Sequence, residues 1–152
     1  MTVRYFKEDA VFHHIGIAVS SLNCVVDSEY TRWDDEVQGV RVAFVDLNGA
    51  PIELIEPLSE TSPISGALSC GRPLVHVCFE VSSLAASIDA AGQHGFHLLG
   101  TPTPAAAFGG RRIAWVYSKT WGLVELLERP DGAIAPTSSE PVKKGEEYYG
   151  RS

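Results

Sequence analysis

Residues 14–22 read HIGIAVSSL and residues 76–84 read HVCFEVSSL, and this pair of stretches decides the fold. The two share the opening histidine, one valine and the closing Ser-Ser-Leu. Further along the chain, IELIE (residues 52–56) matches VELLE (residues 124–128) in the same order. Two ordered matches indicate an internal duplication, in which each copy folds as one module.

The second copy is the more complete of the two. Apolar and polar residues alternate over residues 74–81, which is typical of a strand. Ser82 or Ser83 can cap a following helix, and Gly95 can end it. Further strands are expected at residues 96–99, 112–117 and 123–128, with a loop at residues 101–110. This copy therefore has the order β-α-β-β-β.

The first copy has the outer strands but a reduced middle. Strands are expected at residues 12–19, 40–47 and 52–56, and Asn48-Gly49 between the last two is a strong hairpin signal. Residues 20–38 are polar and weakly periodic, so the helix and the second strand of this module are expected to be curtailed.

Together the copies predict an α+β fold in which paired βαβββ modules form a cupped mixed sheet. The expected domain covers residues 11–130, with modules at residues 11–58 and 72–130 joined by residues 59–71. Residues 131–152 contain few apolar residues and are predicted to form a C-terminal tail.

The repeat places a histidine near the start of each module and a glutamate in each last strand. Each histidine lies on the strand face opposite the apolar residues, so both are expected to face the concavity of a curved sheet. Each glutamate lies between apolar neighbours, where an unpaired carboxylate is costly to bury. Two imidazoles and two carboxylates suit a divalent first-row metal, which could be Co, Mn, Ni, Fe or Zn. The predicted ligands are His14, Glu53, His76 and Glu125.

Each of these residues taken alone has a simpler interpretation. A histidine in a strand is more often a hydrogen-bonded structural residue, and a glutamate in a strand usually faces solvent. Recurrence of all four at matching positions favours the metal. Glu56 and Glu128 also recur, but their opposite parity places them on the other face of the sheet. His13, His94 and His97 have no partners in the repeat and are interpreted as structural or surface residues.

Composition argues against several classes of partner. The net charge is −7 and basic residues cluster only in pairs, so no nucleic-acid partner is expected. No apolar run could span a bilayer and the first residues resemble no signal peptide, so we expect a cytoplasmic protein without a membrane partner. The three cysteines lack paired spacing, which argues against a disulfide framework or a cysteine zinc site.

These motifs resemble the vicinal oxygen chelate superfamily, whose members include glyoxalase I, extradiol dioxygenases, bleomycin resistance proteins and methylmalonyl-CoA epimerase. The resemblance covers about residues 11–130 and is greatest to the epimerase. It is carried, in order, by FHHIGIAVSSL (12–22), QGVRVAFVDLNGAPIELIEPL (38–58), SPIS (62–65), VHVCFEV (75–81), FGGRRIAWV (108–116) and GLVELLER (122–129).

The resemblance implies a glyoxalase-like fold, a homodimer, and one divalent metal on the four residues named above. It also implies a small-molecule substrate, an acyl-CoA thioester such as methylmalonyl-CoA. Glu53 stands where some epimerases have Gln, a combination also found in bacterial glyoxalase I, so a glyoxalase-type lyase stays open. A related biosynthetic enzyme and a non-catalytic resistance-type binding protein stay open as well. The base carboxylate of some epimerases would fall near Val42, which cannot transfer a proton.

An epimerase of this kind removes a proton beside the thioester carbonyl and returns it on the other face. Glu125 and Glu53 are the expected catalytic carboxylates. Gly109 and Gly110 would allow close approach of the backbone to the substrate. Arg111, Arg112 and Lys119 are candidate partners for phosphate or carboxylate, although each could equally be a solvated surface charge.

Overall fold

A computed structural model describes residues 5–7 and 9–130 of the chain, and the predicted tail at residues 131–152 lies outside these residues. No helix among the described residues is long and apolar enough to cross a membrane. The first module consists of β1 (Val11–Ala18), η1 (Leu22–Cys24), β2 (Trp33–Asp35), β3 (Val40–Leu47) and β4 (Ala50–Pro57). Its helix is thus one short 3₁₀ turn and its second strand is three residues long, which confirms the expected curtailment.

The second module follows a linker that holds the short helix α1 (Ser65–Ser69). It consists of β5 (Leu74–Val81), α2 (Leu84–Gln93), β6 (His97–Leu98), β7 (Thr103–Pro104), η2 (Ala106–Phe108), β8 (Arg112–Ser118) and β9 (Gly122–Glu128). The segment at residues 101–110, predicted to be a loop, therefore also contains β7 and η2. Ser83 caps α2 by accepting a hydrogen bond from the Ala86 backbone N–H, as its sequence position predicts.

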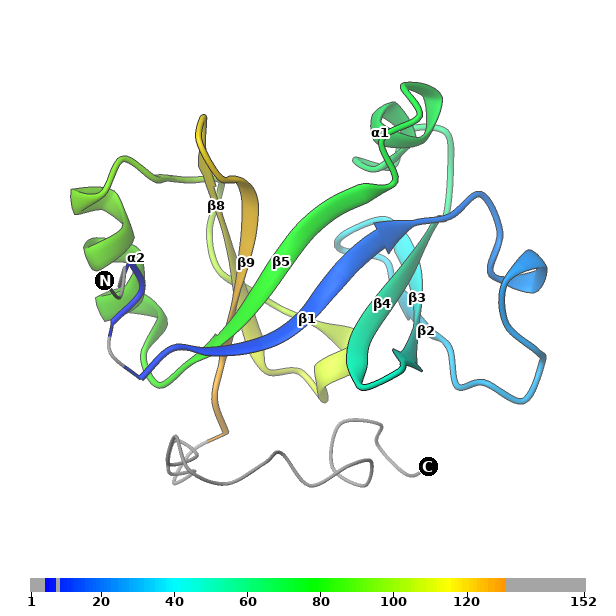
Figure 1. The fold of residues 1–152 in the computed structure, drawn as a ribbon, viewed down its shortest axis with the longest axis horizontal. Coiled ribbons are helices and arrows are strands. Elements are labelled where there is room, and N and C mark those ends of the chain that lie inside the picture. Colours follow the sequence, from blue (N-terminus) through cyan, green and yellow to red (C-terminus); the bar gives the residue numbers. More distant parts are fainter. Residues whose placement is uncertain (1–4, 8, 131–152) are drawn as a thin grey trace.

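The nine strands of the described residues belong to one mixed sheet. Eight lie in the order β2-β3-β4-β1-β5-β9-β8-β6, and β7 pairs with β8. The two first strands of the modules, β1 and β5, are antiparallel neighbours at the centre, and each has its own module's last strand parallel beside it. Figure 1 shows the two halves of the sheet on either side of this central pair. The α+β fold with two repeated modules is therefore confirmed.

The strand registers repeat as well. Gly16 is opposite Glu53 in the β1–β4 pair, and Cys78 is opposite Glu125 in the β5–β9 pair. Gly16 and Cys78 each lie two residues after a predicted histidine ligand, and residues two apart in a strand face the same side. Each module therefore presents its histidine and its glutamate on one face.

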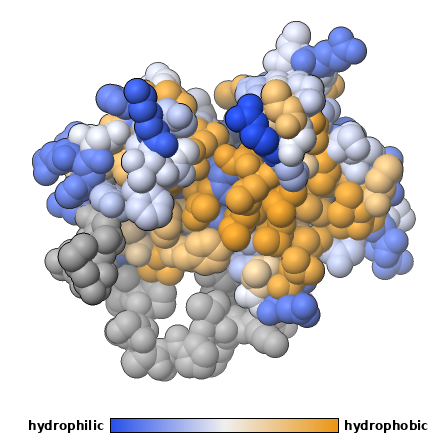
Figure 2. Space-filling view, turned by 45° about the horizontal axis from the view of Figure 1, so that its top comes forward, coloured by the Kyte–Doolittle hydropathy of each residue, from blue (hydrophilic) through white to orange (hydrophobic). Residues whose placement is uncertain are grey.

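Three apolar clusters hold this sheet together. One lies between the sheet and α2 and includes Leu84, Ala91 and Leu126. A second packs η1 through Leu22 onto β3 and β4. The third lines the inner face and includes Phe44, with Phe108 packed over it. Apolar side chains also reach the surface, and Figure 2 shows them gathered across the middle of one face.

The packed region extends beyond residue 11 toward the N-terminus. Phe6 is buried in the cluster under α2, and Tyr5 packs against it. The hydroxyl of Ser87 donates a hydrogen bond to the backbone oxygen of Phe6 at 3.0 Å. Residues 5 and 6 therefore close one side of the core that α2 leaves open.

Candidate metal centre

The four predicted ligands meet at the centre of the sheet. Nε2 of His14 lies 3.3 Å from Oε2 of Glu53 and 3.3 Å from Oε2 of Glu125. Nε2 of His76 lies 3.3 Å and 3.5 Å from the same two oxygens. The two Nε2 atoms are 3.1 Å apart. One nitrogen or oxygen atom from each of four strands therefore converges on one point.

These separations fit a bound metal ion. Zinc-type bonds to nitrogen and oxygen are about 2.1 Å long, so two ligands of one tetrahedral ion lie about 3.4 Å apart. All four side chains are buried. Oε2 of Glu125 is fully buried and accepts no hydrogen bond from the described residues, although such an atom normally has a partner. A cation between the four donors would satisfy this oxygen.

The two histidines and the two glutamates shift one another's pKa values. Burial alone would lower the pKa of His76, but its contacts with Glu125 and Glu53 outweigh burial and raise the pKa to about 9. Burial opposes the same contacts at His14, whose pKa is also raised. At both glutamates burial would raise the pKa, yet the histidines hold it below its ordinary value. The metal-free cluster therefore keeps anionic carboxylates beside protonated imidazole, where a bound cation would take the place of the protons.

Neighbouring residues hold the histidine rings in place. The ring of His14 packs edge-on to Phe44 at 5.3 Å and lies 5.8 Å from Phe108, measured between centroids. The ring of His76 packs edge-on to Trp115 at 4.9 Å. Aromatic rings packed against both histidines restrict the orientations of the imidazoles.

Glu53, His76 and Glu125 also form part of the wall of a cavity of about 450 Å³. Most of the other lining residues are apolar and come from both modules, among them Val42, Ile55, Val75, Phe108, Trp115 and Leu123. No lysine or arginine is among the described lining residues. The cavity therefore suits an apolar or neutral group whose one polar end reaches the four converging side chains.

The third carboxylate of the cavity joins the two modules. Asp35, on β2, accepts hydrogen bonds from the backbone N–H and the side-chain amide of Gln38, and from the backbone N–H of Ala106 at 3.2 Å. Nε1 of Trp115 donates to Oε1 of Gln38 at 3.1 Å. The first-module turn after β2 is thereby tied to η2 and β8 of the second module. Nothing in the periodicity of residues 20–38 pointed to this role.

The predicted substrate-binding residues do not line the cavity. Arg111 donates to Glu80 at 2.9 Å, and Arg112 forms a two-pronged pair with Glu128 at 2.9 Å and 2.7 Å. Lys119 is exposed in the turn between β8 and β9. Gly109 and Gly110 form the left-handed turn after η2, next to the lining residue Phe108. Both arginines are engaged in ion pairs within the fold.

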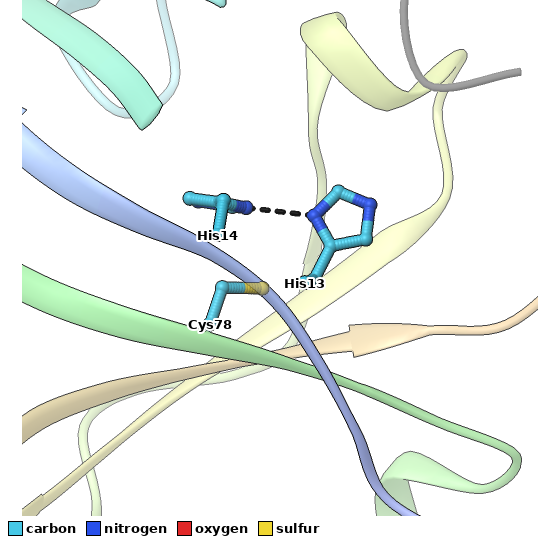
Figure 3. Close-up of side chains that lie close together, drawn as sticks. All are labelled: His13, His14 and Cys78. Carbon is cyan, nitrogen blue, oxygen red and sulfur yellow. Dashed lines mark hydrogen bonds between the residues drawn. The ribbon is translucent and has the colours of Figure 1, made fainter. Parts of the chain in front are cut away.

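The residues set aside as structural or surface groups differ in their surroundings. His94 and His97 are exposed, whereas His13 is buried. Burial lowers the pKa of His13 to about 4, which keeps its imidazole neutral. Figure 3 shows His13 turned toward His14, with Cys78 close by. Burial also raises the pKa of the Cys78 thiol well above its ordinary value, so this cysteine stays protonated.

Glu56 and Glu128 lie on the other face of the sheet, as their parity predicts, but both are half-buried and paired. Glu56 accepts a hydrogen bond from the backbone N–H of Leu22 and thus holds η1 onto β4. Glu128 pairs with Arg112. Their recurrence in the repeat reflects support of the sheet rather than a second site.

Known proteins share both the sequence pattern and the fold. The family model described as the Glyoxalase/Bleomycin resistance protein/Dioxygenase superfamily matches residues 13–115. Ethylmalonyl-CoA/methylmalonyl-CoA epimerase of Cereibacter sphaeroides is 31% identical over 127 residues, which cover 75% of this chain and 94% of that protein.

Solved structures of methylmalonyl-CoA epimerases have a similar fold. Methylmalonyl-CoA epimerase from Mycobacterium tuberculosis has a TM-score of 0.66 at 26% identity, covering 78% of this chain and 87% of that one. A variant of the Streptomyces coelicolor methylmalonyl-CoA epimerase in complex with 2-nitronate-propionyl-CoA has a TM-score of 0.66 at 25% identity, covering 79% and 94%. These comparisons support an enzyme of the epimerase or racemase class. The chain belongs to the Glyoxalase/Bleomycin resistance protein/Dioxygenase superfamily.

Proposed function

We propose that the chain is a metal-dependent epimerase of an acyl-CoA thioester such as methylmalonyl-CoA. The observation that carries the proposal is the convergence of two imidazoles and two carboxylates, 3.1–3.5 Å apart, in the wall of an apolar cavity. The printed activity of the Cereibacter sphaeroides relative supports the choice of substrate class.

His14, Glu53, His76 and Glu125 would hold the metal through the atoms that face one another. A bound divalent metal supplies a Lewis acid that polarises the thioester carbonyl and makes the neighbouring proton more acidic. Glu53 and Glu125 line the cavity from opposite halves of the sheet. One carboxylate would take the α-proton, while the other, which must enter the step protonated, would give its proton to the opposite face of the same carbon, so that the two exchange protonation states.

The cavity walls would orient the substrate and exclude water. Val42 and Ile55 of the first module line the cavity together with apolar residues of the second, so the cavity could hold an apolar α-substituent and the thioester arm. Since no lysine or arginine is among the described lining residues, the phosphates of a coenzyme A would have to lie outside this cavity. Lys119 is exposed and is proposed as a cation that binds them.

A glyoxalase I-type lyase is the second candidate. It is favoured by the carboxylate at Glu53, because Val42 supplies no base and Glu53 and Glu125 would then have to move the proton. The other carboxylate among the described lining residues, Asp35, is held by hydrogen bonds from Gln38 and Ala106. A cytoplasmic location and a homodimeric assembly remain predictions from the sequence.

The proposal is tested by incubating metal-loaded protein with methylmalonyl-CoA in D₂O and following the α-proton by NMR. We expect loss of the α-proton signal in the wild type and at least about a hundredfold slower loss in Glu125→Gln. Binding of methylmalonyl-CoA without exchange would favour the non-catalytic binding protein. Turnover of a glutathione hemithioacetal in place of exchange would favour the lyase.

A further inference from the structure

The side chain of His13 contacts the imidazole of His14 on the side that faces away from the other three predicted ligands. Nδ1 of His13 lies 2.7 Å from Nδ1 of His14, and both rings are buried. The other nitrogen of His14, Nε2, faces His76 and the two carboxylates. His14 therefore has one ring nitrogen directed to the predicted metal site and one directed to His13. Figure 3 shows the contact between His14 and His13.

Two consecutive strand residues normally point to opposite faces of a sheet. A β-bulge removes this alternation here. Phe12 is opposite Phe79 and His14 is opposite Cys78, so the register shifts by one residue at His13. Such bulges redirect a side chain, and they are frequent beside functional sites. The bulge allows the two consecutive imidazoles to meet edge to face, with centroids 5.0 Å apart.

The contact fits a hydrogen bond better than a second metal site. His13, His14 and Cys78 could in principle ligate a metal together. Two nitrogen ligands of one ion, each about 2.1 Å from it, lie about 3.0–3.4 Å apart. The observed 2.7 Å is shorter than this and lies within the range of a nitrogen–nitrogen hydrogen bond.

The direction of this hydrogen bond follows from the role of His14. When Nε2 of a histidine serves as a ligand, Nδ1 carries the remaining ring proton and donates it to a neighbour. Nδ1 of His13 is then the acceptor. In most metal sites a carboxylate, a carbonyl or water takes this place; here it is an imidazole packed edge-on against Phe108 at 5.5 Å.

We propose that His13 is a positioning residue that selects the ligating tautomer of His14 and fixes the plane of its ring. The proposal rests on the metal site of the proposed function, but it concerns affinity and tautomer rather than the reaction catalysed. Loss of the acceptor would leave the Nδ1 proton of His14 buried without its partner and would free the ring to turn away from the cluster.

Two substitutions of different chemistry separate this role from simple packing. His13→Asn can place its side-chain oxygen close to the former position of Nδ1 and so keep an acceptor, whereas His13→Leu fills the space without one. His13→Met replaces His13→Leu if the latter does not fold. Co²⁺ affinity of each full-length protein is measured by competition with a chelating dye, and the His14 ring tautomer by ¹⁵N NMR of the Zn²⁺-loaded protein.

We expect His13→Leu to weaken Co²⁺ binding by about 10- to 100-fold. His13→Asn should stay within about threefold of the wild type and keep the Nδ1–H tautomer of His14. Equal affinities for His13→Leu and the wild type would overturn the proposal, as would equal losses in the Leu and Asn variants. A second bound Co²⁺ that disappears in both His13→Leu and Cys78→Ala would overturn it in favour of a second metal site. A wild type that binds no metal would refute the metal site of the proposed function as well.

Discussion

Gly16 is directly opposite His76 in the β1–β5 pair, and a Cβ atom at Gly16 would overlap the His76 imidazole. The ring of a predicted metal ligand in one module thus lies over the backbone of the other module's first strand. Gly16 belongs to the His-Ile-Gly stretch that begins the first repeat, while its counterpart in the second repeat is Cys78. The two modules are therefore not equivalent at this point, although their four ligands are.

Gly16→Ala is predicted to displace the His76 ring and to weaken metal binding by at least about tenfold, because one ligand in four loses its position. Gly92→Ala is the matched control. Gly92 lies in α2, where an added Cβ meets nothing within 4 Å, so this variant should keep wild-type affinity and gain up to about 1 kcal/mol in stability. Titration with Co²⁺ and urea unfolding measure the two quantities. Wild-type metal affinity in Gly16→Ala would show that the His76 imidazole does not depend on the absence of a Cβ atom at residue 16.

Metal binding is predicted to release protons. The pKa of His76 is raised to about 9 in the metal-free fold, so this side chain is protonated at neutral pH and must lose its proton to become a ligand. Apparent metal affinity should therefore rise about tenfold per pH unit for this proton as the pH approaches 9. Calorimetry at pH 7.5 in buffers of different ionisation enthalpy counts the protons. At least one per metal is expected, and a count of zero would contradict the protonated cluster.

The same raised pKa predicts how the metal-free protein responds to pH. A histidine whose pKa is higher in the folded than in the unfolded state stabilises the fold while it is protonated. The contribution of His76 is fully present below its unfolded value of 6.5 and is lost as the pH rises through about 9. Urea unfolding of metal-free protein should therefore show stability falling between these values, and saturating metal should remove the fall. A flat profile without metal would argue against the coupling.

Glu125→Gln is predicted to weaken metal binding and to slow α-proton exchange, because it keeps the size of the side chain but removes its charge from the cluster. Glu128→Gln is the control on the same strand. Glu128 pairs with Arg112, whose side chain is largely exposed, so its loss should cost less than about 1 kcal/mol and leave metal binding unchanged. Metal analysis after gel filtration compares the two variants. Equal metal content in both would remove Glu125 from the ligand set.

Phe6→Ala is predicted to destabilise the fold by about 3–5 kcal/mol, because it empties a site in the core between the sheet and α2. Phe12→Ala should cost clearly less, since that ring is 45% exposed. Urea unfolding curves of the two variants give the comparison. Similar small losses in both would show that residues 5 and 6 are not part of the cooperative core.

The repeat predicted that the four side chains converge, because strand pairing carries the sequence pattern directly into space. Each His-to-Glu pair recurs in the same register within its module, so parity alone places the four donors on one face. His13 was not predicted as part of the site, because it has no counterpart in the repeat. Strict alternation along the strand would also point it away from His14. Only the bulge before His14 brings the two rings together, and alternation along a single strand does not reveal a bulge.

Hydrogen bonds between irregular segments that lie far apart in the sequence could not be predicted either. Asp35 accepts a hydrogen bond from the backbone of Ala106, far along the chain, in segments that have weak periodicity. Arg111 was a candidate partner for a phosphate or carboxylate of the substrate, and in the fold its guanidinium donates a hydrogen bond to Glu80 of β5. Which side a lone arginine faces depends on neighbours that only the tertiary structure supplies.

The central claim is that these four side chains bind one divalent metal. Its most direct test is the metal content of tag-free protein by mass spectrometry, for the wild type beside His76→Ala. Both proteins are first dialysed against the same mixture of Co²⁺, Mn²⁺, Ni²⁺ and Zn²⁺. We predict about one equivalent of metal per chain in the wild type and almost none in His76→Ala, because the variant lacks one of the four ligands. A wild type that stays empty, or a His76→Ala protein that stays full, would contradict the account.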